Sequence, residues 1–148
     1  MVPARIAIAL APLILWPATI RAQENPWERQ VQQQLEHAAQ TISRDGNGWA
    51  HDLQVGFMNA DESEAFTLTL PSGASYALVG ACDNDCTSLH LLLYNDAGNY
   101  EVASARTANE PPVVQLTPKE ATRYRVKVVM AGCRLNPCWY GIALYRIR

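Results

Sequence analysis

The sequence predicts an all-β fold, an antiparallel β-sandwich preceded by one N-terminal amphipathic helix. Apolar residues recur at helical spacing near the N-terminus, whereas short strand-like segments separated by turn residues fill the rest of the chain. Two closely spaced cysteine pairs lie within that strand-like part. No helix-length pattern interrupts residues 65–148, which argues against a parallel α/β sheet.

The N-terminus has the pattern of a secretory signal. Arg5 supplies positive charge, the apolar run 6–16 is short for a membrane span, and Ala22 can precede a cleavage site. We therefore expect residues 1–22 to be a signal peptide and the mature protein to be periplasmic or secreted. An uncleaved N-terminal anchor is the alternative. No later segment is long and apolar enough to span a membrane.

The rest of the chain suits one domain, with a helix and linker at 23–48 and a β-sandwich at 49–148. The 12 Lys and Arg against 14 Asp and Glu give a net charge of −2. Cleavage of the signal would make that charge more negative. A mildly acidic chain with scattered arginines lacks the charge pattern for nucleic acid or anionic lipid.

The predicted helix begins near Asn25 and Pro26, which suit an N-cap and a first helical position. The segment 45–48, Asp-Gly-Asn-Gly, ends it. We expect its apolar stripe to pack on the sandwich, with docking of a partner protein as the alternative. The stripe consists of Trp27, Val31, Leu35, Ala38 and Ile42.

Seven short strands are predicted in the remaining chain, with turn residues between them. Their ranges are 65–70, 76–81, 89–94, 100–105, 112–116, 123–129 and 139–147. This number of short strands without intervening helices is typical of an antiparallel sandwich.

Four cysteines in an exported chain predict disulfides, and three connectivities are open. Pairing across the two clusters would close longer loops and restrain the unfolded chain more. The turn-forming residues inside each cluster instead favour local bridges. We favour Cys82–Cys86 and Cys133–Cys138, with no free thiol.

From about residue 60 to the C-terminus, the chain resembles the bacterial pre-peptidase C-terminal domain family. The matching segments are 64–70 (EAFTLTL), 76–83 (YALVGACD), 89–99 (LHLLLYNDAGN), 122–128 (TRYRVKV) and 138–145 (CWYGIALY). The resemblance implies a jelly-roll-like β-sandwich of the kind usually attached to secreted peptidases. The cysteines are similar to those of a disulfide-bearing, stand-alone branch. This chain departs from the family in having no preceding peptidase, and His90 where many relatives have Asp.

Metal and catalytic patterns in the sequence are weak. Asp83 and Asp85 flank Asn84 in one turn, which makes the two aspartates candidate calcium ligands. The preferred interpretation is a solvated turn with side-chain-to-backbone hydrogen bonds, and so no cofactor. The cysteine spacings do not favour zinc. No residue is assigned a catalytic role, because His37, His51 and His90 show no motif of a hydrolase or metal site.

We therefore predict an exported, non-catalytic binding or accessory module rather than an enzyme. Its expected partner is an envelope or extracellular protein or a glycan, and its ligand is unknown. One alternative is a small secreted hydrolase or hydrolase-associated factor. The other is a calcium-dependent carbohydrate or adhesion domain, since aromatic side chains on a sandwich can stack on sugars. Most of the aromatics are expected to fill the core instead.

Overall fold

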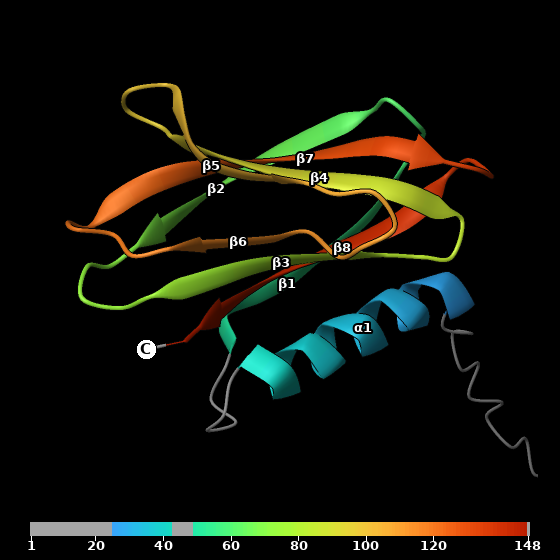
Figure 1. Cartoon of the computed structure of the whole chain (residues 1–148), viewed down its shortest axis with the longest axis horizontal. Helices are drawn as coiled ribbons and strands as arrows, with labels where there is room; N and C mark the ends of the chain where they lie inside the picture. The colour runs from blue at the N-terminus through green and yellow to red at the C-terminus, as the bar shows by residue number, and fades with distance from the viewer. Residues whose placement is uncertain (1–24, 43–48, 148) are drawn as a thin grey trace, which may run out of the picture.

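The computed structural model describes residues 25–42 and 49–147, with the side chains of 49–53 excepted (Figure 1). The predicted signal peptide and most of the predicted linker lie outside the described residues. The described chain forms one helix, α1 (Pro26–Ile42), and eight strands. The strands are β1 (Trp49–Met58), β2 (Ser63–Leu70), β3 (Tyr76–Cys82), β4 (Cys86–Asn95), β5 (Tyr100–Arg106), β6 (Val113–Leu116), β7 (Thr122–Cys133) and β8 (Cys138–Arg146).

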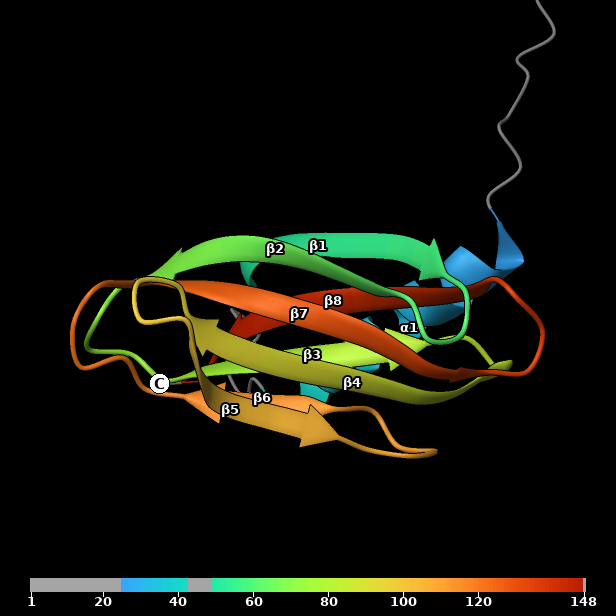
Figure 2. The same ribbon diagram turned by 90° about the horizontal axis from the view of Figure 1, so that it is seen from above.

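The strands form two four-stranded sheets packed face to face, as Figures 1 and 2 show. One has the order β1-β8-β3-β6 and carries α1 on its outer side, so we name it the helix-side sheet. The other has the order β2-β7-β4-β5, and we name it the open sheet. Neighbouring strands in both sheets are antiparallel. This double-sheet arrangement of eight strands is a jelly roll and confirms the predicted fold class.

The sequence prediction missed β1, which pairs with β8 along one edge of the helix-side sheet. Its register shifts twice, between Trp49 and His51 and between His51 and Gln54. Each irregularity breaks the alternation of inward and outward residues that marks a strand in a sequence. Met58, at the end of β1, is buried in the core.

The main core lies between the two sheets and is built from alternate residues of their strands. In β7, for example, Val126 and Val128 are fully buried while Arg125 and Lys127 are partly exposed. Three tyrosines, Tyr76, Tyr124 and Tyr140, belong to this core. That placement agrees with the expectation that most aromatic residues fill the interior.

Helix α1 packs on the outer side of the helix-side sheet and buries a second apolar cluster. Val31 and Leu35 are 0 % exposed, and the Tyr145 hydroxyl donates a hydrogen bond of 2.6 Å to the Leu35 carbonyl. Gly141 makes this contact possible, since a Cβ there would lie 2.5 Å from Val31 Cγ1. The apolar stripe therefore covers the sandwich, as expected. Its first member, Trp27, differs from the prediction because it remains 43 % exposed.

Burial raises the pKa of Tyr145 to about 12. An unfolded tyrosine ionises near pH 10. Stability from the neutral, buried phenol is therefore fully present below about pH 10 and is lost as the pH rises toward about 12. We expect the urea midpoint to fall across this interval, and to fall less in Tyr145→Phe. Equal slopes for the two proteins in a pH series of urea titrations would contradict this assignment.

Candidate functional site

Both cysteine clusters lie at one end of the sandwich, which we call the disulfide end. Cys82–Cys86 bridges the connection from β3 to β4, and Cys133–Cys138 bridges the connection from β7 to β8. The Cα atoms are 5.9 Å apart in each pair, a normal disulfide separation. These are the local pairings favoured from the sequence. Each connection leads from one sheet to the other, so each bridge ties the two sheets together.

The two cysteine loops also bind each other. The backbone N–H of Arg134 donates to the Asp85 carbonyl over 2.8 Å, and the Arg134 guanidinium donates to the Asn84 carbonyl. Cys86 and Cys133 face each other as register partners on β4 and β7. The disulfide end is therefore one connected unit of covalent and hydrogen-bonded loops.

Asp83 is the buried centre of this unit and is 4 % exposed. Its Oδ1 accepts the backbone N–H groups of Asp85 at 3.1 Å and Cys86 at 3.2 Å. Its Oδ2 accepts the N–H of Trp139 in β8 at 2.7 Å. The sequence predicted a solvated turn with side-chain-to-backbone hydrogen bonds. The hydrogen bonds are present, but Asp83 is buried rather than solvated. The carboxylate joins the β3–β4 loop to the start of β8.

Asp85 differs from Asp83, because it is partly exposed and its described hydrogen bonds are made by its backbone N–H and carbonyl. Both carboxylate oxygens of Asp83 already accept amide hydrogens. Calcium takes six to eight oxygen ligands, roughly, so two aspartates alone would not complete a site. Among the described side chains of residues 25–42 and 54–147, no three His, Cys, Asp or Glu gather as a metal site would require.

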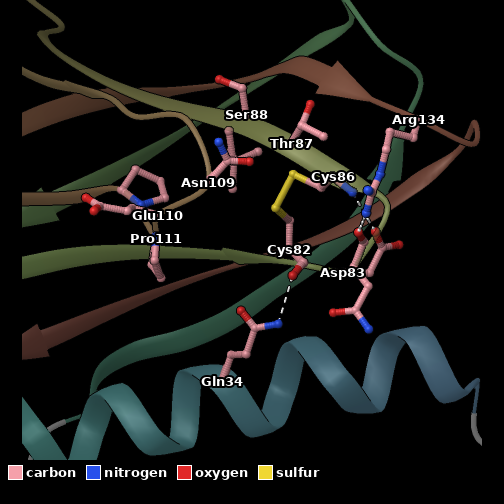
Figure 3. A pocket seen from close by; sticks show the side chains of 13 residues that line it. Gln34, Cys82, Asp83, Cys86, Thr87, Ser88, Asn109, Glu110, Pro111 and Arg134 are labelled. Atoms are coloured by element: carbon pink, nitrogen blue, oxygen red, sulfur yellow. Dashed lines mark hydrogen bonds between the residues drawn. A yellow bond between two sulfur atoms is a disulfide. The ribbon is translucent and has the colours of Figure 1, made fainter.

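A pocket of about 270 Å³ opens beside the Cys82–Cys86 bridge (Figure 3). One wall is the disulfide loop, and another is the β5–β6 connection with Glu110 and Pro111. Helix α1 contributes Gln34, whose Nε2 donates to the Cys82 carbonyl over 2.8 Å. The complete lining is Gln34, Cys82, Asp83, Asn84, Cys86, Thr87, Ser88, Leu89, Asn109, Glu110, Pro111, Pro112 and Arg134.

The loop wall of the pocket is fixed by backbone contacts. The Asn109 N–H donates to the Thr87 carbonyl over 2.9 Å, and the Gly80 N–H donates to the Pro112 carbonyl over 2.9 Å. A side chain at Gly80 would collide with Pro112, since a Cβ there would lie 2.8 Å from its Cγ. No pattern in the sequence predicts a role for this loop. Its Asn-Glu-Pro-Pro run marks a turn but carries no sign of which segments it faces.

Ser88 lines the pocket and forms, with His90, the one Ser–His contact among the described side chains. Ser88 Oγ lies 3.1 Å from His90 Nε2 and donates to the Thr107 carbonyl over 2.8 Å. A hydroxyl has a single proton. Because the Ser88 hydroxyl donates its proton to the hydrogen bond with the Thr107 carbonyl, His90 Nε2 must be the donor in its hydrogen bond with Ser88 Oγ. A serine nucleophile requires the opposite polarity, with the histidine accepting the hydroxyl proton.

The other residues considered from the sequence do not join this pair. His37 lies on α1, and its carbonyl accepts the Thr41 hydroxyl. His51 lies in β1, where its side chain is outside the described residues. Phe57 and Trp139 form an aromatic pair on the helix-side sheet, with ring centroids 5.4 Å apart and Phe57 56 % exposed. Tyr100 on β5 and Trp27 on α1 are further exposed aromatic side chains of the described chain.

Comparison with known proteins supports the fold. No family model and no curated protein matches this chain. Among solved structures, the pre-peptidase C-terminal domain of a collagenase from Bacillus anthracis is similar, with a TM-score of 0.50 and 9 % identity. The match covers 63 % of this chain and 87 % of that domain. The shared feature is the class of β-sandwich, in agreement with the resemblance seen in the sequence.

We expect the purified protein to contain no reactive thiol, because each cysteine of the described chain is in a disulfide. Thiol titration in denaturant without reductant should give essentially zero. Peptide mapping without reduction should recover Cys82 with Cys86 and Cys133 with Cys138. Two thiols per chain, or a peptide that joins the two clusters, would contradict the observed framework.

Proposed function

We propose that this protein is an exported, non-catalytic binding or accessory module whose ligand occupies the pocket at the disulfide end. The observation that carries the proposal is the construction of that pocket. Two disulfides, the buried Asp83 and the contact from Gln34 hold its walls in place. Rigid walls lower the entropy lost on binding, which is what a recognition site requires.

The pocket lining favours a ligand with both polar and apolar groups. Thr87, Asn109 and Glu110 offer hydrogen-bonding groups, while the exposed Pro111 offers apolar surface. Such a mixture suits a segment of an envelope or extracellular protein, or a glycan. The acidic composition argues against nucleic acid.

Export is supported by the N-terminal pattern and by the disulfides, which persist in oxidising compartments. No helix in the described ranges has the length and apolar character needed to cross a membrane. The sandwich similarity supports an accessory role, as in a disulfide-bearing, stand-alone member of the pre-peptidase C-terminal domain family.

Blocking the pocket tests the proposal. Glu110→Trp places a large side chain at the exposed rim, and Glu120→Trp makes the same change at an exposed turn elsewhere. Each protein is immobilised and exposed to its own envelope fraction and to a glycan array. We expect a ligand retained by wild type and Glu120→Trp, and lost by Glu110→Trp. Equal retention by all three proteins would place binding outside the pocket.

The hydrolase alternative rests on the Ser88–His90 contact and has its own test. Wild type is assayed with ester, peptide and glycoside substrates, next to Ser88→Ala and His90→Gln. The hydrogen-bond polarity at Ser88 predicts no turnover above that of the two variants. Turnover by wild type that both variants lose would make the protein a hydrolase and refute the non-catalytic proposal.

A further inference from the structure

A row of cations lies on the outer side of the open sheet, away from the pocket. Arg123, Arg125 and Lys127 occupy alternate positions of β7, and Arg106 lies on β5 of the same sheet. Their intervening neighbours on β7 are core residues, so these side chains point outward. We call this surface the cationic face. Figure 2 shows no described helix over it, whereas α1 covers the other sheet.

The charges on this face are only partly neutralised. Arg106 pairs with Glu101 at 2.9 Å and Arg123 pairs with Asp96 at 2.5 Å. The Arg125 guanidinium instead donates to the Asn99 side-chain oxygen and lies 5.2 Å from the centre of the Tyr94 ring. Arg125 and Lys127 have no carboxylate partner among the residues described. Two uncompensated positive charges therefore sit side by side on an acidic protein.

The position of these charges favours a ligand with repeated anionic groups. Alternate residues of a strand are about 6.6–6.8 Å apart, so Arg123, Arg125 and Lys127 form a straight, evenly spaced series. Thr67 and Tyr94 flank Arg125 in the register across the sheet and can bond to hydroxyl groups. A polysaccharide with carboxylate or sulfate groups can lie along such a flat surface and meet successive cations.

A protein partner fits this face less well. Protein interfaces depend on a central apolar anchor in a desolvated pocket. The large aliphatic residue on this face, Leu92, is only 8 % exposed. The exposed apolar side chains Trp27, Phe57 and Leu135 lie on α1, β1 and the β7–β8 loop. Those on the open sheet, Tyr100 and Val102, lie on its edge strand β5 and not at its centre.

We propose that the cationic face binds an anionic polysaccharide through Arg125 and Lys127. This goes beyond the pocket function, although the choice of a glycan rests on the proposed export. The full chain is tested by affinity electrophoresis in gels with polygalacturonate, dextran sulfate or neutral dextran. We expect retardation by the two anionic polymers alone, and its loss as salt rises from about 20 to about 200 mM.

The decisive variant is Arg125→Gln with Lys127→Gln, which should weaken binding about tenfold, as expected for the loss of two exposed ion pairs. Arg29→Gln with Lys119→Gln removes the same charge from exposed positions elsewhere and should bind as wild type. Arg125→Lys with Lys127→Arg should retain binding. Melting curves check that all variants are folded.

The proposal would be overturned if neither anionic polymer retarded wild type, or if both double-Gln variants were weakened equally. It would also be overturned by stronger binding to poly-glutamate than to the polysaccharides. The last result would identify an acidic protein as the partner. Glu110→Trp separates the two sites. Normal retardation of this variant supports a binding face distinct from the pocket. Loss of its retardation would show that the polymer binds in the pocket, and would refute the cationic-face proposal.

Discussion

Replacing Asp83 with alanine is expected to lower the free energy of unfolding by about 3–5 kcal/mol. The carboxylate accepts hydrogen bonds from the backbone N–H groups of Asp85, Cys86 and Trp139 at a position that is 4 % exposed. Its removal leaves the N–H groups of Asp85 and Trp139 without this acceptor, while the Cys86 N–H keeps the Asp83 carbonyl as its second acceptor. Hydrogen bonds to charged groups contribute about 1.5–3 kcal/mol each. Urea unfolding of wild type and Asp83→Ala measures the difference.

Asp85→Ala is the matched control and should change stability by less than about 0.5 kcal/mol, because the described contact of Asp85 uses its backbone. Asp83→Asn keeps one acceptor oxygen and should fall between the two. Added calcium should leave the melting temperature of wild type unchanged. If calcium stabilises wild type but not Asp83→Ala, the turn is a metal site and the structural role given to Asp83 is wrong.

Replacing Leu35, a helix residue packed on the sheet, with alanine is expected to lower the free energy of unfolding by a similar amount. Leu35 is 0 % exposed against β3 and β8, and replacing such a buried leucine with alanine costs about 2–5 kcal/mol. Gln33→Ala, on the exposed side of α1, should be close to neutral. Chemical denaturation of both variants gives their free energies of unfolding. A loss in Leu35→Ala alone is due to packing, whereas an equal loss in both would be a general effect of substitutions in the helix.

Deleting residues 23–46 extends the same argument. The deletion would expose the apolar cluster formed by Val79, Ala143 and Tyr145, and should lower stability and solubility. The core between the sheets contains no helix residue, so a cooperative, β-rich domain should remain. Loss of all cooperative unfolding, followed by circular dichroism, would show that α1 is integral to the sandwich.

The sequence was sufficient to predict the elements with regular alternation. The Arg-Tyr-Arg-Val-Lys-Val-Val segment at 123–129 alternates because its even-numbered positions enter the core. In contrast, β1 escaped prediction because its two register shifts disrupt that period. The helix stripe predicted the burial of Val31 and Leu35 correctly. It could not show that Trp27 extends beyond the packed contact.

The candidate site was less predictable because its parts are distant in the chain. The turn residues identified the Cys82–Cys86 loop, but the burial of Asp83 depends on Trp139, which approaches only in the folded state. Gln34 and Glu110 meet at the pocket from α1 and from the β5–β6 connection. Likewise, arginines that look scattered in the sequence are brought onto one face by the register of β5 and β7 with β4.

The central claim is that the pocket at the disulfide end holds a ligand in the exported protein. Photo-crosslinking in intact cells tests it most directly, with the photoreactive residue p-benzoylphenylalanine placed at position 110 or, as control, at position 120. Glu110 lines the pocket and Glu120 lies in an exposed turn outside it. We predict a discrete crosslinked product from position 110 and none from position 120. The same products from both positions, or none from position 110, would contradict a binding role for this pocket.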